Sequence, residues 1–228
     1  LSQAEGYNMN TIMAPCAACY SRLKRAGIKV ARDPAVVSRI NELIGQEYKG
    51  GVAVKHLIEV LTENQTTLES TVVRPLEGLK VACYYGCLLV RPPEVADFDD
   101  AENPVTMDEI VRTLGAEPVG WSHKTECCGA SFSFSKPDIA ARLVGDILEA
   151  ALLAEADVIA VACPLCHANL DMRQAAAARK LHKKYSVPIL YISQLIGLAQ
   201  GKDRRLLGLD KHVVSPDNAL QSLKAPSR

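Results

Sequence analysis

The sequence predicts an α/β fold built from two pseudo-repeated modules, with short parallel strands and flanking helices. Two observations predict it. First, an apolar segment that ends in a Cys-x-x-Cys motif occurs at residues 12–19 and again at 159–166, and a helical pattern follows each copy. Second, each half returns through another apolar segment, at residues 52–58 and 187–192. Such internal similarity indicates duplicated units, and strands that alternate with helices favour a parallel sheet.

The expected helices follow these strands in order. One begins at about Tyr20, after the first motif, and another runs from the second motif to about Lys184. Residues 80–83 form an expected buried strand between the two halves. The strands and helices so placed divide the chain into consecutive units. We expect the first module at 1–75, the second at 76–200, and a C-terminal helix and tail at 201–228.

Two further helices are expected inside the second module. The first covers residues 106–114, with Thr106 as its N-cap and Gly115 beyond its end. The second covers residues 137–155 and begins at Pro137, a residue that suits the first turn of a helix.

The composition excludes several classes of protein. Among 228 residues, Lys and Arg total 26 and Asp and Glu total 26, so no basic field favours nucleic acid. No apolar segment is long enough to span a bilayer, and no secretion signal begins the sequence. We therefore expect a cytoplasmic protein. Its eight cysteines then indicate metal or redox chemistry, because disulfide frameworks belong to small secreted domains.

Most of the cysteines form one pattern in the second half of the chain. The pattern consists of Cys87, Cys127, Cys128, Cys163 and Cys166. Convergent thiolates suit zinc or an iron–sulfur centre. Adjacent cysteines fit a single zinc ion poorly, whereas a multi-iron cluster offers each of them a different iron atom. Gly129, directly after the adjacent pair, permits unusual backbone dihedrals. The pattern favours iron–sulfur binding, with zinc as the alternative.

The residues around this pattern carry a family resemblance. Residues 82–87, 127–130 and 163–171 resemble the CCG-domain signature, and specifically that of the B subunit of heterodisulfide reductase. The resemblance implies two CCG modules, each of which holds a noncubane [4Fe-4S] cluster through five cysteines. The five cysteines above would ligate one complete cluster, and Cys16 and Cys19 would be two ligands of the other.

The first cluster lacks three ligands in this sequence. Projecting the spacing of the second module back from Cys16 places the missing cysteines before Leu1, and about 60–65 residues are then expected to precede the sequence.

The resemblance also implies a function. The chain would be the catalytic subunit of a disulfide oxidoreductase that reduces the coenzyme M–coenzyme B disulfide, or a related one, in one-electron steps. The alternative is an electron-transfer subunit of a quinone-linked oxidoreductase for lactate, glycolate or succinate. No nucleotide-binding motif is present in the sequence. By resemblance, electrons would come from a ferredoxin-like C subunit and a flavin-containing A subunit, and beyond them from a hydrogenase or formate dehydrogenase.

Three side chains are candidate proton donors or substrate ligands. His167, directly after the second motif, could deliver a proton, or it could lie on the surface or cap a helix. His123 and Lys124 could bind an anionic substrate or protonate a thiolate, or they could belong to a solvated loop.

Three other residues are expected to have structural roles. Cys83 lies four residues before Cys87 and is expected to be a buried thiol rather than a ligand. Trp121 and Phe132 are expected to pack around the cluster loop.

Overall fold

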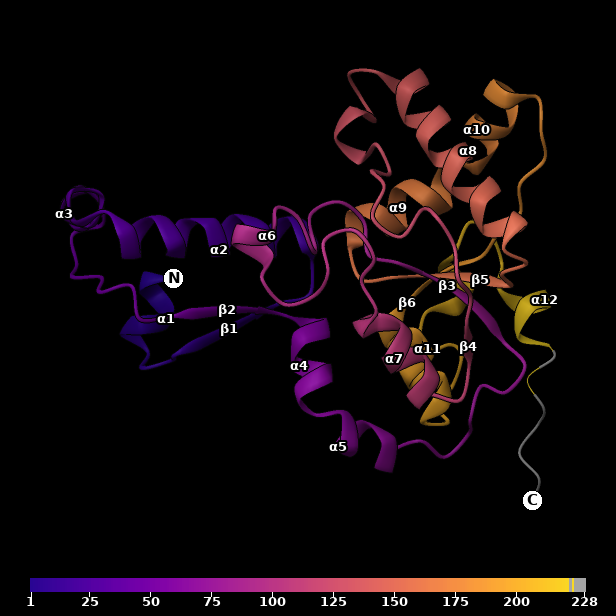
Figure 1. The fold of residues 1–228 in the computed structure, drawn as a ribbon, viewed down its shortest axis with the longest axis horizontal. Helices are drawn as coiled ribbons and strands as arrows, with labels where there is room; N and C mark the ends of the chain where they lie inside the picture. Colours follow the sequence, from indigo (N-terminus) through magenta and orange to yellow (C-terminus); the bar gives the residue numbers. More distant parts are fainter. Residues whose placement is uncertain (222, 224–228) are drawn as a thin grey trace.

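The computed structural model describes residues 1–221 and 223 and shows an α/β architecture with two parallel sheets (Figure 1). The larger sheet has the strand order β4-β3-β5-β6, and the smaller one consists of β1 and β2. The strands are β1 (Thr11–Ala14), β2 (Ala53–His56), β3 (Lys80–Tyr84), β4 (Glu117–Pro118), β5 (Val158–Val161) and β6 (Ile189–Tyr191). The register pairs Ala14 with His56 in the small sheet and Val161 with Tyr191 in the large one.

Helices cover both faces of the large sheet (Figure 1). On one face lie α8 (Pro137–Leu153), α9 (Pro164–Met172) and α10 (Gln174–Leu181); on the other lie α7 (Thr106–Thr113) and α11 (Ile192–Ala199). The remaining helices are α1 (Ser2–Gly6), α2 (Ala17–Arg32), α3 (Pro34–Ile44), α4 (Leu57–Glu63), α5 (Gln65–Ser70), α6 (Pro93–Ala96) and α12 (Asp217–Leu220), with 3-10 turns η1 (Ala130–Phe132) and η2 (Leu209–Lys211). None of the helices in the described part of the chain is long and apolar enough to cross a membrane.

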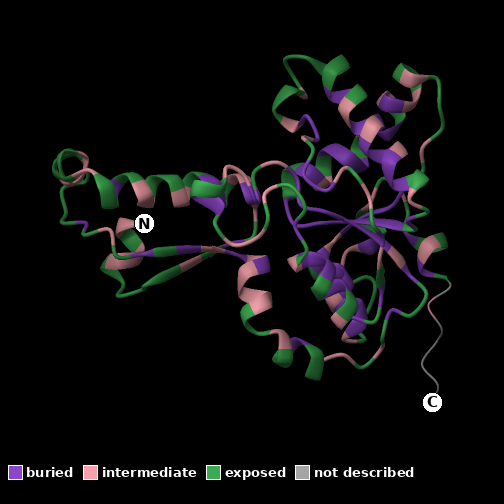
Figure 2. Cartoon of the chain, in the orientation of Figure 1, coloured by how far each residue is buried: buried purple, intermediate pink, exposed green. Residues whose placement is uncertain are grey.

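The main hydrophobic core surrounds the large sheet. All four residues of β5 are buried, as expected for a central parallel strand covered on both faces (Figure 2). The unit formed by α1, β1, α2, α3 and β2 extends away from this sheet and is much more exposed (Figures 1 and 2). Ala17 of α2 and Ile58 of α4, the helix directly after β2, join this unit to the main core, because both side chains pack within that core.

The structure corrects several predicted boundaries. The first helix begins at Ala17 rather than Tyr20, so that Cys16 is its N-cap. The helix expected to reach Lys184 is broken at Arg173 into α9 and α10. The predicted helices at 106–114 and 137–155 are confirmed to within two residues.

The prediction that Thr106 is the N-cap of α7 is wrong. The N-cap is Val105, and the carboxylate of Asp99 accepts hydrogen bonds from the backbone N–H groups of Val105 and Thr106. An acidic side chain from the preceding loop therefore performs the capping. Gly115 does follow the end of the helix, with φ +80°.

The expected C-terminal surface helix is also replaced by shorter elements. Residues after 201 form turns, η2 and α12, and Leu209 and Leu220 are buried. These two side chains dock the segment on the main core. The end of the expected tail, from Lys224 onward, lies outside the described residues.

Candidate metal centre

The cysteines of the second half lie at the carboxyl ends of parallel strands. Cys87 follows β3, and Cys127 and Cys128 lie in the loop between β4 and α8. Cys163 follows β5 as the N-cap of α9, whose first turn carries Cys166. Because the carboxyl ends of parallel strands meet at one edge of a sheet, loops that are distant in sequence converge there.

The five thiols meet in two groups. The Sγ atoms of Cys128 and Cys166 are 3.6 Å apart, and the thiol of Cys166 also forms a hydrogen bond with Cys163. In the other group, Cys87 forms a hydrogen bond with Cys127. The backbone N–H of Gly129 donates a hydrogen bond to Cys127 Sγ at 3.4 Å. None of the cysteines forms a disulfide. The structure therefore brings together all five predicted ligands of the complete centre.

The close contacts shift the pKa values of these thiols in opposite directions. The bond from Cys87 lowers the pKa of Cys127 to about 6, and the bond from Cys166 lowers the pKa of Cys163 to about 5. The pKa of Cys87 is raised chiefly by its hydrogen bond with Cys127 and then by burial, and the pKa of Cys166 by its hydrogen bonds with Cys128 and Cys163 and then by burial. Soft thiolates in such a group fit an iron–sulfur centre or zinc.

Gly86 and Tyr84 lie close to the thiols. Gly86 has φ +69°, and a Cβ there would lie 3.3 Å from Cys166 Sγ. Tyr84 is buried beneath the thiols, and its pKa is raised by burial and then by Cys166 and the other cysteines. Its hydroxyl donates to the carbonyl of Glu126 at 2.5 Å, which fixes the loop just before Cys127.

Hydrogen bonds hold the loop that follows the adjacent cysteines. Asn169 of α9 donates to the carbonyl of Cys128 at 2.6 Å, and Ser133 donates to the Asn169 side chain at 2.6 Å. Arg173 donates to the carbonyl of Ser133 at 3.1 Å. Sequence reasoning assigned no role to Asn169. Its position three residues after Cys166, on a helix that starts at the motif, was the available signal.

We expect Gly129→Ala to loosen this loop and to weaken metal retention. Gly129 has φ +78°, and an added Cβ would lie 3.0 Å from Ala140 Cα. The strained conformation alone should lower the free energy of unfolding by about 1–3 kcal/mol. Chemical denaturation and iron analysis measure the two effects. Gly120→Ala is the matched control, because nothing lies within 4 Å of its Cβ position; equal effects of the two substitutions would contradict this account.

The first Cys-x-x-Cys motif lies beside the second. The backbone N–H of Ala18 hydrogen-bonds the sulfur of Cys163, and the charge of Cys163 acts on Cys16. Burial, the largest cause, raises the pKa of Cys16 to about 11. Cys19 is exposed. The two motifs thus meet at a junction between the small sheet and the large one.

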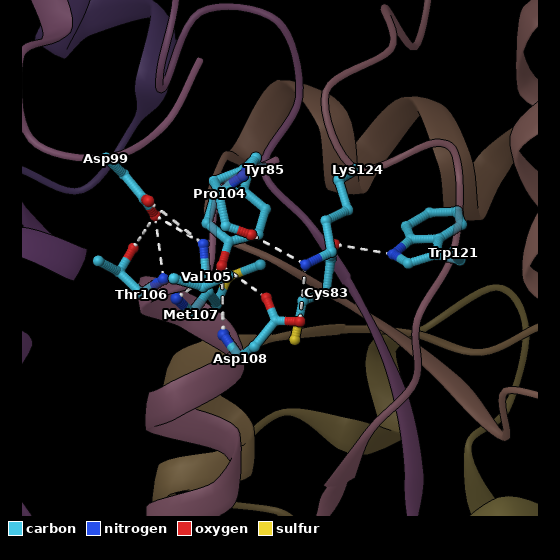
Figure 3. A network of polar contacts seen from close by, with 10 residues as sticks. All are labelled: Cys83, Tyr85, Asp99, Pro104, Val105, Thr106, Met107, Asp108, Trp121 and Lys124. Atoms are coloured by element: carbon cyan, nitrogen blue, oxygen red, sulfur yellow. Dashed lines mark hydrogen bonds and ion pairs between the residues drawn. The ribbon is translucent and has the colours of Figure 1, made fainter. Parts of the chain in front are cut away.

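Lys124 belongs to a buried polar network. Its ammonium donates to Asp108 Oδ1 and to the carbonyl of Pro104, both at 2.9 Å (Figure 3). The hydroxyl of Tyr85 donates to Asp108 Oδ2 at 2.6 Å. Lys124 and Asp108 are 7% and 4% exposed. The ammonium therefore forms an internal ion pair, which connects the loop before Cys127 to α7.

Cys83 lies at the edge of this network, apart from the five thiols. It is fully buried in β3, and its thiol lies beside Asp108 (Figure 3). Burial, followed by Asp108, raises its pKa well above the ordinary value. Its backbone carbonyl accepts a hydrogen bond from the indole N–H of Trp121 at 3.0 Å. Trp121 packs against the main core, whereas Phe132 is 40% exposed in η1.

The two candidate histidines lie in different surroundings. His123 is half-buried beside Trp121, in a groove of about 480 Å³ that Asp146 and Glu149 also line. None of the described cysteines lines that groove. His167 stacks on Tyr191 with ring centres 4.1 Å apart.

Polar contacts hold the His167 ring. Its Nε2 lies 3.0 Å from the carbonyl of Ile189 and 3.3 Å from His212 Nδ1. His212, Asp171 and His167 are close enough to resemble a metal site. The carbonyl of Ile189 accepts from His167 Nε2, and Gln194 donates to the carbonyl of Leu207 and to His212 Nε2.

A second groove, of about 520 Å³, is lined by residues of the loops that carry the cysteines, although none of the described cysteines lines it. Ala130, which follows the adjacent cysteines and Gly129, and Leu165, inside the second motif, both line it. Arg173 and Arg179 add positive charge to the same groove. An anionic group is favoured here more than in the groove of His123, which carries carboxylates.

The fold and the convergent thiols define a cysteine-rich α/β domain, and residues 81–171 match the family CCG, cysteine-rich domain. The chain is 36% identical over 223 residues to the B subunit of a ferredoxin/F420H2-dependent CoB–CoM heterodisulfide reductase of Methanosarcina acetivorans, covering 94% of this chain and 72% of that protein. It is 34% identical over 217 residues to an 8-methylmenaquinol:fumarate reductase membrane anchor subunit of Wolinella succinogenes, covering 94% and 75%. The chain belongs to the family of CCG-domain proteins that includes the B subunit of heterodisulfide reductase.

A solved structure shares the fold. A hypothetical protein from Helicobacter pylori superimposes with a TM-score of 0.60 at 12% identity, over 84% of this chain. This chain spans 35% of that protein. The likeness supports the α/β architecture alone.

Proposed function

We propose that this chain is the catalytic iron–sulfur subunit of a disulfide-reducing complex. Cys87, Cys127, Cys128, Cys163 and Cys166 would hold one noncubane [4Fe-4S] cluster. Cys16 and Cys19 would provide part of the ligand set of a second. The observation that carries the proposal is the convergence of five thiols at one strand edge, with a second Cys-x-x-Cys motif beside them.

The adjoining motifs suit a reaction that needs two electrons. Iron–sulfur clusters supply electrons singly, whereas the reduction of a disulfide requires a pair. The backbone N–H of Ala18 is near enough to the sulfur of Cys163 to help lower the pKa of that thiol, so one substrate could meet both centres. Gly86 leaves space beside Cys166 Sγ, because a Cβ at that position would lie 3.3 Å from the sulfur. Arg173 and Arg179 would attract an anionic end of the disulfide.

A second candidate function is electron transfer to or from a quinone-linked oxidoreductase. The similarity to the fumarate reductase subunit of W. succinogenes favours it. In both functions the chain works inside a complex. For the disulfide reductase, the partners we propose are a ferredoxin-like C subunit and a flavin-containing A subunit, supplied by a hydrogenase or formate dehydrogenase.

The test follows electrons from a reduced viologen dye to a disulfide. The full-length protein is purified without oxygen together with its partner subunits, and the coenzyme M–coenzyme B disulfide is added. Oxidation of the dye that depends on the disulfide, and that a simple thiol disulfide does not elicit, is the expected result. If neither disulfide draws electrons while a menaquinone or fumarate couple does, the electron-transfer function replaces the one we propose.

A further inference from the structure

The thiols of Cys87 and Cys127 lie on two backbone segments that hydrogen bonds join directly. Cys87 lies in the turn after β3, and Cys127 lies three residues after Lys124. The backbone N–H groups of Tyr85 and Gly86 both donate to the carbonyl of Lys124, at 2.8 and 3.0 Å. The contact between these segments, which we call the Cys87 segment and the Cys127 segment, therefore sets how far apart the two thiols lie.

The side chains of the same two segments meet a second time, on the carboxylate of Asp108. The hydroxyl of Tyr85 donates to Oδ2 at 2.6 Å, and the ammonium of Lys124 donates to Oδ1 at 2.9 Å (Figure 3). The Tyr85 hydroxyl also accepts the backbone N–H of Met107 at 2.7 Å. One carboxylate of α7 thus bridges the Cys87 segment and the Cys127 segment, with one oxygen for each.

The other group of thiols is held from the opposite face of the sheet. There Asn169 of α9 donates to the carbonyl of Cys128 at 2.6 Å, and α9 and α7 cover opposite faces (Figure 1). The bridge on Asp108 therefore acts on the pair of Cys87 and Cys127 in particular.

The ion pair in this bridge is buried, with Asp108 4% and Lys124 7% exposed. A buried ion pair often adds no more stability than apolar side chains of the same size would, because both charges lose their hydration. Apolar side chains could not supply its directed hydrogen bonds, however. A geometrical role therefore accounts for the pair better than a contribution to stability does.

We propose that Asp108 is a positioning residue for the complete iron–sulfur centre, because its carboxylate holds the Cys87 and Cys127 segments in one fixed arrangement. The role rests on the proposed function for the presence of a cluster. Side chains that orient metal ligands without touching the metal change metal affinity or activity by about 10–100-fold when they are mutated. Asp108 would act in this way, through the backbone of its two hydrogen-bond donors.

Three substitutions test the bridge. Asp108→Ala removes both acceptor oxygens. Asp108→Asn keeps the size of the side chain, and it can accept from Lys124 through its oxygen while its amide donates to the Tyr85 hydroxyl. Tyr85→Phe removes one half of the bridge and keeps the ring.

The measurement is the rate at which the full-length chain, purified without oxygen, loses iron to a chelator. We expect Asp108→Ala to release the iron of the complete centre about 10–100-fold faster than the wild type. Tyr85→Phe should change the rate in the same direction by a smaller factor. Asp108→Asn should retain most of the wild-type rate, since it can restore both hydrogen bonds.

Gln174→Ala is the matched control for a loss of stability alone. Gln174 is 3% exposed, and its side chain bonds both backbone groups of Val187 at the start of another loop. Its removal should lower thermal stability without speeding the release of iron.

The outcomes separate the role of Asp108 from the proposed function. Release from Asp108→Ala that is no faster than from Gln174→Ala would overturn the role of Asp108 and leave the proposed function intact. If Asp108→Ala does not fold, a wild-type rate in Tyr85→Phe overturns it equally. A wild-type protein without iron and sulfide would overturn the proposed function, and the role of Asp108 with it.

Discussion

Replacing Cys166 by alanine should abolish iron binding at the complete centre and lower disulfide-dependent turnover more than about 100-fold. Cys166 touches both Cys128 and Cys163, so its removal breaks the larger of the two thiol groups. Residues that only support a ligand already change metal affinity or activity by about 10–100-fold when mutated, and loss of a ligand should exceed that. Iron analysis and the viologen assay measure the two effects.

Cys83→Ala is the matched control for that substitution. Cys83 is at least as deeply buried as Cys166, but it lies beside Asp108 rather than among the five thiols. We expect it to keep its iron and its turnover, with only the modest loss of stability that a small cavity causes. Loss of iron in Cys83→Ala, or its full retention in Cys166→Ala, would contradict the ligand set.

Lys124→Met should lower the free energy of unfolding by about 3–5 kcal/mol, because it leaves the buried carboxylate of Asp108 without its cation. Asp108 would retain the hydroxyl of Tyr85 as a hydrogen-bond donor but would lose its cation. Chemical denaturation of the chain measures the change. Lys80→Ala, which breaks the exposed ion pair with Glu155, should leave stability almost unchanged.

Lys124→Met also distinguishes a structural role of Lys124 from a catalytic one. Asp108→Asn combined with Lys124→Met removes both charges and should recover part of the lost stability. If Lys124→Met were as stable as the wild type and yet lost disulfide-dependent turnover, the ion pair would be incidental and the lysine would act on the substrate.

The strands and the cysteine motifs were predictable because their signals are local. A short apolar segment that runs into Cys-x-x-Cys marks a strand that ends at a ligand-bearing turn, and both copies occur as expected. The helix after the second motif was predicted as continuous. It breaks at Arg173, where the backbone leaves helical geometry with φ −105° and ψ 8°, and nothing in the flanking alanines and glutamine signals that break.

The surroundings of the candidate side chains depend on contacts between distant residues. Lys124 meets Asp108 across 16 positions, and Asp171 accepts the backbone N–H groups of Val213 and Val214 more than 40 positions away. Local sequence patterns cannot predict which of these distant side chains contact each other. In the sequence, Asp108 is typical only of the first turn of a helix, and nothing there shows which side chains its carboxylate meets.

Metal analysis of the full-length protein, purified without oxygen, tests the central claim most directly. Five thiols in contact should hold iron and acid-labile sulfide in equal amounts, four of each for the complete centre, with zinc near zero. Absorption edges of iron and zinc, measured on the same sample, identify which metal the sulfurs bind. Zinc at one ion per centre, without sulfide, would contradict the account and assign the cysteines a structural role.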